Sequence, residues 1–340
     1  SLGGNGPRGL SFARSYNSQQ VNQDSAGLGK GWNHGYNIRL NQHSDVKTAL
    51  GLRSPQDAAA LIVAAYVSRD LMSPTQPSLK EWTVGALVAQ WATDQLQDKA
   101  VSVQLGDRAL SYRQLPDGSF VAPPGVTTQL IKNANGTYKL SERFGTVLAF
   151  DANRRIQSLT DIDGNALSFT YTGDLLTQVK DAYNRTLTLS YTAGKLTQVA
   201  DNQGRAVTYS YTGNDLTQFR DPENKLWQYG YDASHQILTV TDPVNAVIVS
   251  NAYDDRNRVT QQTAPRDNNT TGLYQLHYTG LSSAEQDPAG QRTTYYYDTA
   301  GRTVAVENAL GQIAKTAYDR LNRLTQTDHL ADTSQDTFSY

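Results

Sequence analysis

The chain has 340 residues, which is long for one ordinary core and predicts either two domains or a repeat architecture. Its 30 basic residues nearly balance its 32 acidic residues, which argues against a general attraction to nucleic acid or anionic lipid. Cysteine is absent, which excludes disulfides, thiolate metal sites and cysteine nucleophiles. The longest apolar run, residues 58–67, is about half of what a bilayer span needs, so we expect no membrane span. Because Ser1 follows no initiator methionine and begins no leader, we expect a piece of a longer protein.

Residues 1–43 predict an amino-terminal β segment. Leu10 and Phe12 alternate with small residues as in a strand, and the glycine cluster at residues 27–31 predicts a turn into a second strand at residues 36–40. A phosphate-binding loop is the competing interpretation of this cluster, because a lysine lies among the glycines. It fails because no Ser or Thr follows the lysine and the spacing is wrong.

Residues 44–100 predict a helical insertion. Ser54 is a cap residue that precedes a proline, and residues 78–81 repeat the capping pattern with an acidic residue at the third helical position. The apolar residues that follow have helical spacing: Val84, Leu87, Val88 and Trp91. Residues 73–77, with two prolines, separate the two helices of this hairpin. The hairpin is either a cap on an exposed sheet end, since uncovered edges invite aggregation, or a docking arm for a partner.

After a β segment at residues 101–149, a cassette of about 20 residues recurs throughout residues 150–340. Tyrosines and aspartates keep two separate registers with a step of 20: Tyr171, Tyr191, Tyr211 and Tyr231, and Asp161, Asp181, Asp201 and Asp221. The tyrosine pattern then continues with steps of 22, 25, 19 and 21: Tyr253, Tyr278, Tyr297 and Tyr318. Insertions of this size belong in turns, where loops absorb length at low cost.

Each cassette predicts two short strands and two turns. Residues 195–200 and 206–211 are rich in β-branched and aromatic residues, with Tyr209 and Thr208 on opposite faces of the second strand. Residues 201–204 have a turn composition, because the Asp side chain accepts backbone N–H bonds and the Gly takes positive φ. One hairpin is barely stable alone, so cassettes are expected to stack into a continuous antiparallel sheet that coils as it grows.

The sequence predicts no catalytic, cofactor or metal site. Asp161 and Asp163 look like half of a calcium loop, but the distant glutamate is missing and Asp161 shares the register of the turn aspartates. Too many aspartates are equivalent for a glycosidase pair to be chosen, and no Gly-x-Ser-x-Gly elbow occurs. The histidines are scattered, with no i, i+4 pair: His34, His43, His235, His277 and His329.

The paired tyrosines have two interpretations. In each pair the residues lie two apart and so face one side of the sheet: Tyr209 and Tyr211, Tyr229 and Tyr231, Tyr295 and Tyr297. Cross-strand aromatic pairs stabilise a sheet by roughly 0.2 to 1 kcal/mol each, which favours a structural ladder. The alternative is a glycan- or partner-binding face made by Tyr209, Tyr229, Tyr295 and Tyr297.

The repeat pattern Y-[DT]-x-x-[GN]-R-L-T-x-V-x-D-x-x-G resembles the YD repeat of Rhs proteins. It is clearest at residues 253–260, 297–302 and 318–325. The resemblance runs from about Phe150 to Asp328. Residues 7–18 and 27–34 are similar to the segment that precedes the first YD repeats in Rhs and wall-associated proteins.

This resemblance implies a mainly β fold, in which YD-repeat hairpins coil into a curved sheet or shell fragment. The inserted helical hairpin departs from the plain Rhs pattern. In the family, the repeats form a hollow β-shell that encloses a carboxy-terminal toxin, in bacterial proteins that are secreted or displayed on the cell surface. The implied partners are the rest of the shell, its toxin and a secretion-system or surface partner, with self-association through open sheet edges. The self-cleavage site and the toxin would lie past residue 340. An adhesin module that binds carbohydrate or protein is the alternative, and a hydrolase is a third hypothesis.

Overall fold

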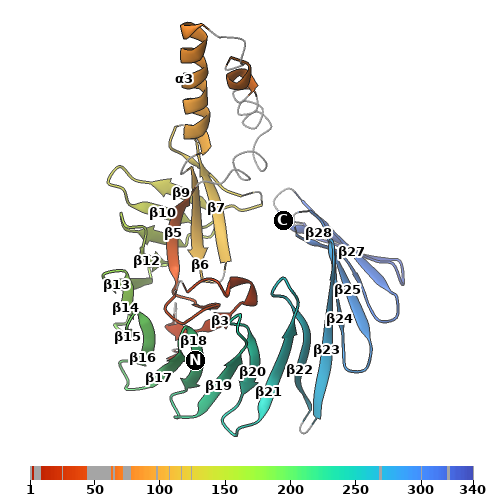
Figure 1. Ribbon diagram of the computed structural model, residues 1–340. Coiled ribbons are helices and arrows are strands. Elements are labelled where there is room, and N and C mark those ends of the chain that lie inside the picture. The colour runs from red at the N-terminus through yellow and green to blue at the C-terminus, as the bar shows by residue number, and fades with distance from the viewer. Residues whose placement is uncertain are drawn as a thin grey trace. The chain divides into compact units, whose positions relative to one another are not determined.

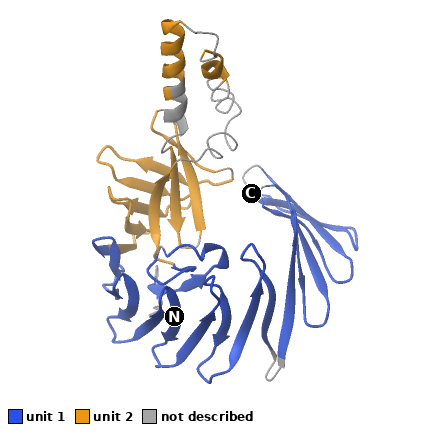
Figure 2. Ribbon diagram, in the orientation of Figure 1, with its two compact units in different colours: residues 1–34, 170–340 blue, residues 35–169 orange. Residues whose placement is uncertain are grey.

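The computed structural model describes residues 2–3, 9–24, 26–43, 63, 66–71, 78–96, 99–106, 108–115, 117–123, 125–267, 270–299, 301–319 and 322–339. The chain forms two compact units, one made of residues 1–34 and 170–340 and the other of residues 35–169 (Figure 2). Antiparallel strands dominate both units. The start of the helix expected at Ser54 lies outside the described residues.

The second unit contains two runs of neighbouring antiparallel strands (Figure 1). The first run is β5 (Ile38–His43), β6 (Ala100–Leu105), β7 (Arg108–Gln114) and β8 (Phe120–Val121). The second run is β9 (Gln129–Lys132), β10 (Tyr138–Ser141), β11 (Val147–Phe150), β12 (Ile156–Thr160) and β13 (Ala166–Thr172). The strand expected at residues 36–40 therefore begins two residues later, at Ile38.

Between β5 and β6 the chain forms the helix α3 (Leu79–Leu96), and residues 66–71 are also helical. The capping pattern at the start of α3 is a capping box: the Ser78 backbone N–H donates to Glu81 Oε2 at 2.6 Å, and the Glu81 N–H donates to Ser78 Oγ at 3.4 Å. Leu79, Trp82 and Leu87 are exposed on this helix. The presence of inserted helices, predicted from the sequence, is confirmed, and the bounds of the insertion at residues 44–100 stay a prediction.

The first unit begins with two short ladders and then continues with the repeats. β1 (Leu2–Gly3) pairs with β2 (Ser11–Phe12), and β3 (Arg14–Tyr16) pairs with β4 (Trp32–His34), with a 3-10 turn at Ser18–Gln20 between them. The single strand expected at residues 10–14 is therefore two short strands. The region from residue 9 to residue 34 is called the amino-terminal segment below.

The repeats of the first unit form hairpins in which consecutive strands are neighbours in sequence order. The strands are β14 (Leu175–Lys180), β15 (Thr186–Thr192), β16 (Lys195–Asp201), β17 (Ala206–Thr212), β18 (Asp215–Arg220), β19 (Leu226–Tyr231), β20 (Ile237–Thr241), β21 (Val247–Tyr253), β22 (Val259–Asp267), β23 (Thr270–Thr279), β24 (Ser282–Gln286), β25 (Arg292–Tyr297), β26 (Thr303–Glu307), β27 (Ile313–Tyr318), β28 (Leu324–His329) and β29 (Ser334–Thr337). The predicted mainly β array of YD-repeat hairpins is confirmed.

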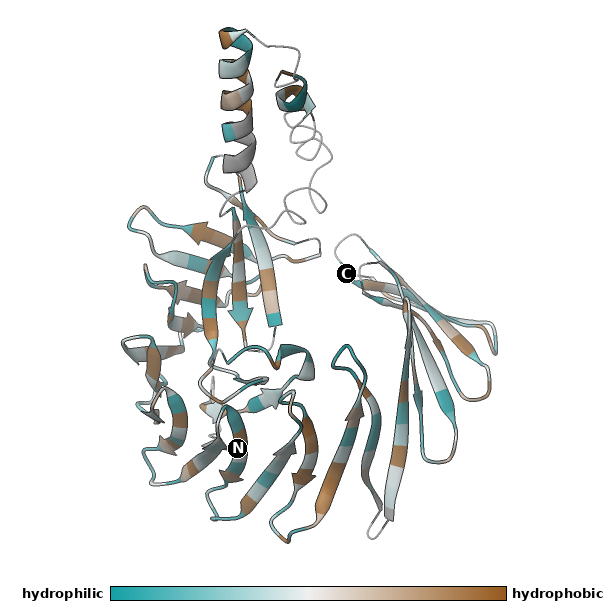
Figure 3. Ribbon diagram, in the orientation of Figure 1, coloured by the Kyte–Doolittle hydropathy of each residue, from teal (hydrophilic) through white to brown (hydrophobic). Residues whose placement is uncertain are grey.

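Apolar and polar residues alternate along these strands (Figure 3), so they lie on opposite faces of the sheet. On β15 and β17 one face carries Leu187, Leu189, Val207 and Tyr209, which are all buried. The other face carries mainly Thr and Ser side chains, such as Ser190, which is exposed. This period of two is what an antiparallel sheet with one packed face requires.

A β-bulge accompanies most of the repeat tyrosines. The ladder between β15 and β16 shifts register between Ser190 and Tyr191, which leaves Thr197 as an extra residue on β16. Thr197 Oγ1 donates to the Ser190 carbonyl at 3.1 Å. The same shift occurs before Tyr211, Tyr231, Tyr253, Tyr297 and Tyr318, but the ladder at Tyr278 has no shift. Because a bulge bends its strand and increases the local twist, these regularly spaced bulges curve the sheet.

Candidate docking site for the amino-terminal segment

The turn aspartates each organise one hairpin turn. Asp181 Oδ1 accepts the backbone N–H groups of Tyr183 and Arg185, both at 2.9 Å, and Asp181 Oδ2 accepts Arg185 Nε at 2.6 Å. Asp201 and Asp254 repeat this arrangement with the arginine four residues later. Other aspartates accept the equivalent backbone N–H groups without an arginine: Asp161, Asp221, Asp232, Asp242 and Asp287.

The hydrogen bonds at these turns favour the ionised carboxylate. The side-chain hydrogen bond from Arg258 is the main reason why the pKa of Asp254 lies below its ordinary value, and the backbone N–H groups of Arg258 and Arg256 add to it. In the part of the chain that the structure describes, no group of three His, Cys, Asp or Glu side chains is placed to hold a metal ion.

The repeat tyrosines join the two strands of one cassette. Tyr191 Oη donates to the Leu176 carbonyl at 3.0 Å. Tyr211 and Tyr231 donate in the same way to the carbonyls of Leu196, at 2.6 Å, and Leu216, at 2.7 Å. Each bond spans 15 residues and satisfies a carbonyl of the preceding strand. Tyr171 lies on β13 with its side chain half-buried.

One row of hairpin turns carries the amino-terminal segment. We call this row the docking edge; it consists of the turns at residues 193–194, 213–214, 232–236 and 254–258. Lys30 N–H donates to the Asn214 carbonyl at 3.0 Å, and Leu196 N–H donates to the Gly27 carbonyl at 2.8 Å. These backbone bonds join residues that are far apart in sequence.

Two glycines make this approach possible. Gly29 has a φ of +90°, and a Cβ at this position would lie 2.6 Å from the Asn214 carbonyl oxygen. Gly27 has a φ of +68°, and its Cβ would lie 2.9 Å from the Gly194 carbonyl oxygen. Any larger residue at either position would therefore clash with backbone that cannot easily move. Gly27 and Gly29 lie two residues apart and thus contact successive hairpin turns of the docking edge.

Side chains of the segment contact the next two turns. Tyr16 Oη donates to the carbonyl of His235 at 2.9 Å, and Ser18 Oγ donates to the carbonyl of Asn257 at 2.6 Å. His235 and Asn257 both have positive φ, at 66° and 61°. Successive turns therefore present equivalent carbonyl acceptors to the segment.

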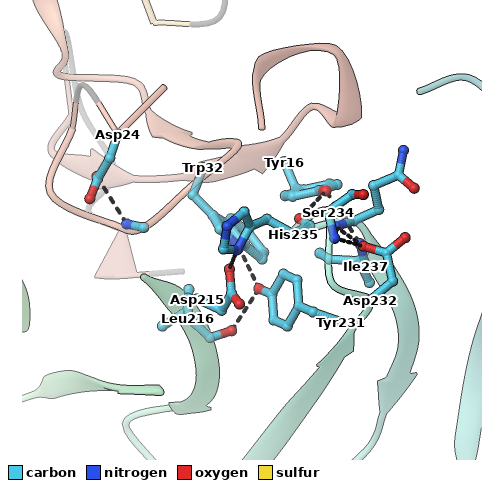
Figure 4. Close-up of polar contacts among 12 residues, drawn as sticks. Tyr16, Asp24, Trp32, Asp215, Leu216, Tyr231, Asp232, Ser234, His235 and Ile237 are labelled. Atoms are coloured by element: carbon cyan, nitrogen blue, oxygen red, sulfur yellow. Dashed lines mark hydrogen bonds and ion pairs between the residues drawn. The ribbon is translucent and has the colours of Figure 1, made fainter. Parts of the chain in front are cut away.

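Tyr16 also packs on an aromatic network (Figure 4). Its ring lies edge-on to Trp32 and Tyr231, with centroids 5.5 and 6.5 Å away. Trp32 Nε1 donates to Tyr231 Oη at 2.8 Å, and Tyr231 in turn donates to the Leu216 carbonyl. Burial raises the pKa of both Tyr16 and Tyr231, so both hydroxyls stay protonated at neutral pH.

Two polar pairs flank this network. Asp24 of the segment forms an ion pair with Lys195 on β16. Asp215 Oδ1 lies 2.8 Å from His235 Nδ1, which links two neighbouring turns of the docking edge (Figure 4). The ion pair of Asp24 and Lys195 is partly shielded from solvent, so salt screens it less than it screens a fully exposed pair.

The tyrosines proposed as a glycan or partner face lie in different surroundings. Tyr209 is 4% exposed, so its ring is not accessible while the segment is docked. Tyr229 is half-buried against Trp32, with ring centroids 5.1 Å apart. Tyr295 and Tyr297 lie half-buried on β25, away from the docking edge. A glycan-binding role for Tyr295 and Tyr297 stays a prediction.

The sequence reasoning did not find the docking site. Its residues come from the amino-terminal segment and from turns and strands at residues 193–258, and no local pattern predicts such a distant pairing. The alternation of Gly27, Gly29 and Gly31 was the available signal, because glycine at every second position indicates repeated close approach of backbone.

Comparisons with known families match two parts of the chain. Residues 2–59, which include the amino-terminal segment, match a family described as a domain of unknown function, DUF6531. Residues 212–247, which include two turns of the docking edge, match the RHS Repeat family. No curated protein matches this sequence.

Solved structures of large toxin complexes are also similar to the chain. The crystal structure of TcdB2-TccC3 is 14% identical over 74% of this chain and 16% of that chain, with a TM-score of 0.38. The Photorhabdus luminescens Tc holotoxin pore is 11% identical over 70% of this chain and 19% of that chain, with a TM-score of 0.37. This chain thus spans less than a fifth of the length of either one. These TM-scores are too low to establish a common overall fold.

Proposed function

Because the chain is an Rhs/YD-repeat protein, we propose that its sheet is a non-catalytic part of the wall of a β-shell that encloses a carboxy-terminal toxin and helps to deliver it in competition between bacteria. The toxin, the rest of the shell and a secretion-system or surface partner are its proposed partners. The proposal places the parent protein outside the cell or at its surface. In the described helices, no stretch is long and apolar enough to cross a membrane.

The observation that supports this proposal is the way in which the sheet grows. Each cassette adds one hairpin next to the last, its tyrosine can join its two strands, as Tyr191, Tyr211 and Tyr231 do, and a bulge at most of the repeat tyrosines adds curvature. Such a sheet lengthens without needing a larger solid core. The amino-terminal segment covers one row of its hairpin turns.

Limited proteolysis of the complete gene product tests the proposal. If the sheet is part of a closed shell, sequence that follows the repeats should resist a nonspecific protease under native conditions and should be digested once the shell is unfolded in urea. The control is the same downstream sequence produced alone. Equal digestion rates for the free and the attached sequence would contradict enclosure.

A further inference from the structure

Arg14 of the amino-terminal segment lies in an aromatic enclosure on the sheet. Its Cζ is 3.7 Å from the ring centroid of Phe219, 5.5 Å from that of Tyr209 and 5.6 Å from that of Trp32. Its Nη2 donates to Tyr229 Oη at 2.7 Å. Tyr209 and Phe219 are themselves stacked, with centroids 5.7 Å apart and planes 25° apart. Three ring systems and one hydroxyl thus surround a single guanidinium group.

The charge of Arg14 is compensated differently from that of the repeat arginines. The repeat arginines pair with the aspartate four residues before them: Arg155, Arg185, Arg205, Arg258, Arg302 and Arg323. Among the described residues, Arg14 has no carboxylate partner, and its Nε is buried without a hydrogen-bond acceptor. The attraction to aromatic faces is therefore its main electrostatic compensation.

We propose that Phe219, Tyr209, Trp32 and Tyr229 form a guanidinium-binding site, which Arg14 fills in cis, and that this occupancy holds the amino-terminal segment on the docking edge. The site selects guanidinium over ammonium for two reasons. A planar, weakly hydrated guanidinium stacks on Phe219, whereas an ammonium keeps a tight hydration shell. The site also offers one hydroxyl acceptor for a group that presents several N–H donors, and a stacked guanidinium tolerates that shortage better than an ammonium does.

This inference does not depend on whether the sheet encloses a toxin. It concerns how the sheet recognises its own segment, and it separates charge recognition from simple apolar packing. If Arg14 contributed only its aliphatic stem, a small cation added in solution could not replace it. If the guanidinium is the recognised group, free guanidinium should fill the site when the side chain is removed.

The experiment measures docking through a single thiol. The natural chain has no cysteine and Ala26 is buried in the segment, so Ala26→Cys introduces one thiol that a maleimide can reach only when the segment detaches. In this background, Arg14→Ala should raise the labelling rate at least about tenfold, the loss expected for a desolvated cation–π contact. Guanidinium chloride at about 20 mM, far below denaturing concentrations, should restore most of the protection. Ammonium chloride at the same concentration should not.

Matched variants distinguish a specific loss of guanidinium binding from a general destabilisation of the sheet. Arg205→Ala removes an arginine that pairs with Asp201 and should leave the labelling rate unchanged. Arg14→Lys should label nearly as fast as Arg14→Ala, and Phe219→Leu combined with Arg14→Ala should abolish the rescue while circular dichroism shows the sheet intact. Unchanged labelling in Arg14→Ala, or equal rescue by ammonium and guanidinium, would overturn the proposal.

Discussion

At the scale of single residues, the two repeated residue types have distinct physical roles. Aspartates close many of the hairpin turns by accepting backbone N–H bonds, as Asp181 and Asp254 do. A repeat tyrosine joins its strand to the preceding strand through its hydroxyl, as Tyr191 does. Both roles depend on a protonation state: the carboxylate must be ionised and the phenol must be neutral. Stability should therefore fall at both ends of the pH scale.

The acid side can be tested at Asp254. Its pKa is lowered in the folded protein, mainly by the hydrogen bond from Arg258, so the ionised form stabilises the fold above the unfolded pKa of about 4. That contribution is lost as the pH falls through the lowered folded value. In urea unfolding at pH values from 7 to 2, Asp254→Asn should be less stable than the wild type at neutral pH. The unfolding free energies of the two proteins should converge in acid. Curves that stay parallel would contradict this role.

The alkaline side can be tested at Tyr191. Burial raises the pKa of Tyr191 to about 12, above the value of about 10 expected in the unfolded chain. Its contribution is complete below pH 10 and is lost as the pH rises through 12. Tyr191→Phe should cost about 1 kcal/mol at pH 7 because the bond to the Leu176 carbonyl is lost, and it should flatten the decline in unfolding free energy between pH 10 and 12. The exposed Tyr183, changed to Phe, serves as the control.

At the scale of elements, the segment and the docking edge stabilise each other by close backbone contact. Gly29 and Gly213 both have positive φ, but only Gly29 has a carbonyl oxygen in the place where a Cβ would lie. Gly213→Ala should cost about 1 to 2 kcal/mol of unfolding free energy from its left-handed conformation alone.

Gly29→Ala should cost more, roughly 3 to 4 kcal/mol, because the clash with the Asn214 carbonyl adds to the strain. It should also speed hydrogen exchange at Lys30 and Leu196, whose N–H groups bond across the interface, whereas Gly213→Ala should leave that exchange unchanged. Equal effects of the two substitutions on stability and exchange would show that the close approach of Gly29 does not matter.

At the scale of the whole molecule, the repeats should behave as a one-dimensional array. Residues 298–318 make one cassette between two repeat tyrosines and lie outside the docking edge. A second copy of these residues should add a hairpin, keep unfolding cooperative and raise the β signal in circular dichroism in proportion to length. A second copy of residues 308–318 alone adds one strand and reverses the chain direction of all later strands. The protein that carries this insertion should therefore unfold or aggregate. If both insertions behaved alike, the array would not be modular.

Self-association through sheet edges stays a prediction for the whole chain, and sedimentation velocity over a range of concentrations tests it. A strictly monomeric species at every concentration would contradict it.

The sequence by itself determined the repeat and its parts. Tyr191, Tyr211 and Asp201 recur at a fixed step, and the strands and turns of a cassette follow from nearby residues, so periodicity was sufficient to predict a hairpin array. The bulge at Thr197 was not predicted, because an extra residue in a strand becomes evident only when the opposite strand is aligned with it.

Only the tertiary structure decided where the amino-terminal segment lies and which side chains hold it there. Arg14, Trp32 and Gly29 have no local pattern that names their partners, because those partners lie on turns and strands that come beside them only after the sheet has coiled. Tyr209 shows the same limit: its face of the strand was predictable, but its burial beneath Arg14 depends on a segment almost 200 residues earlier in the chain. The local residue pattern determines the secondary structure, whereas packing against residues distant in sequence determines which partners each strand face contacts.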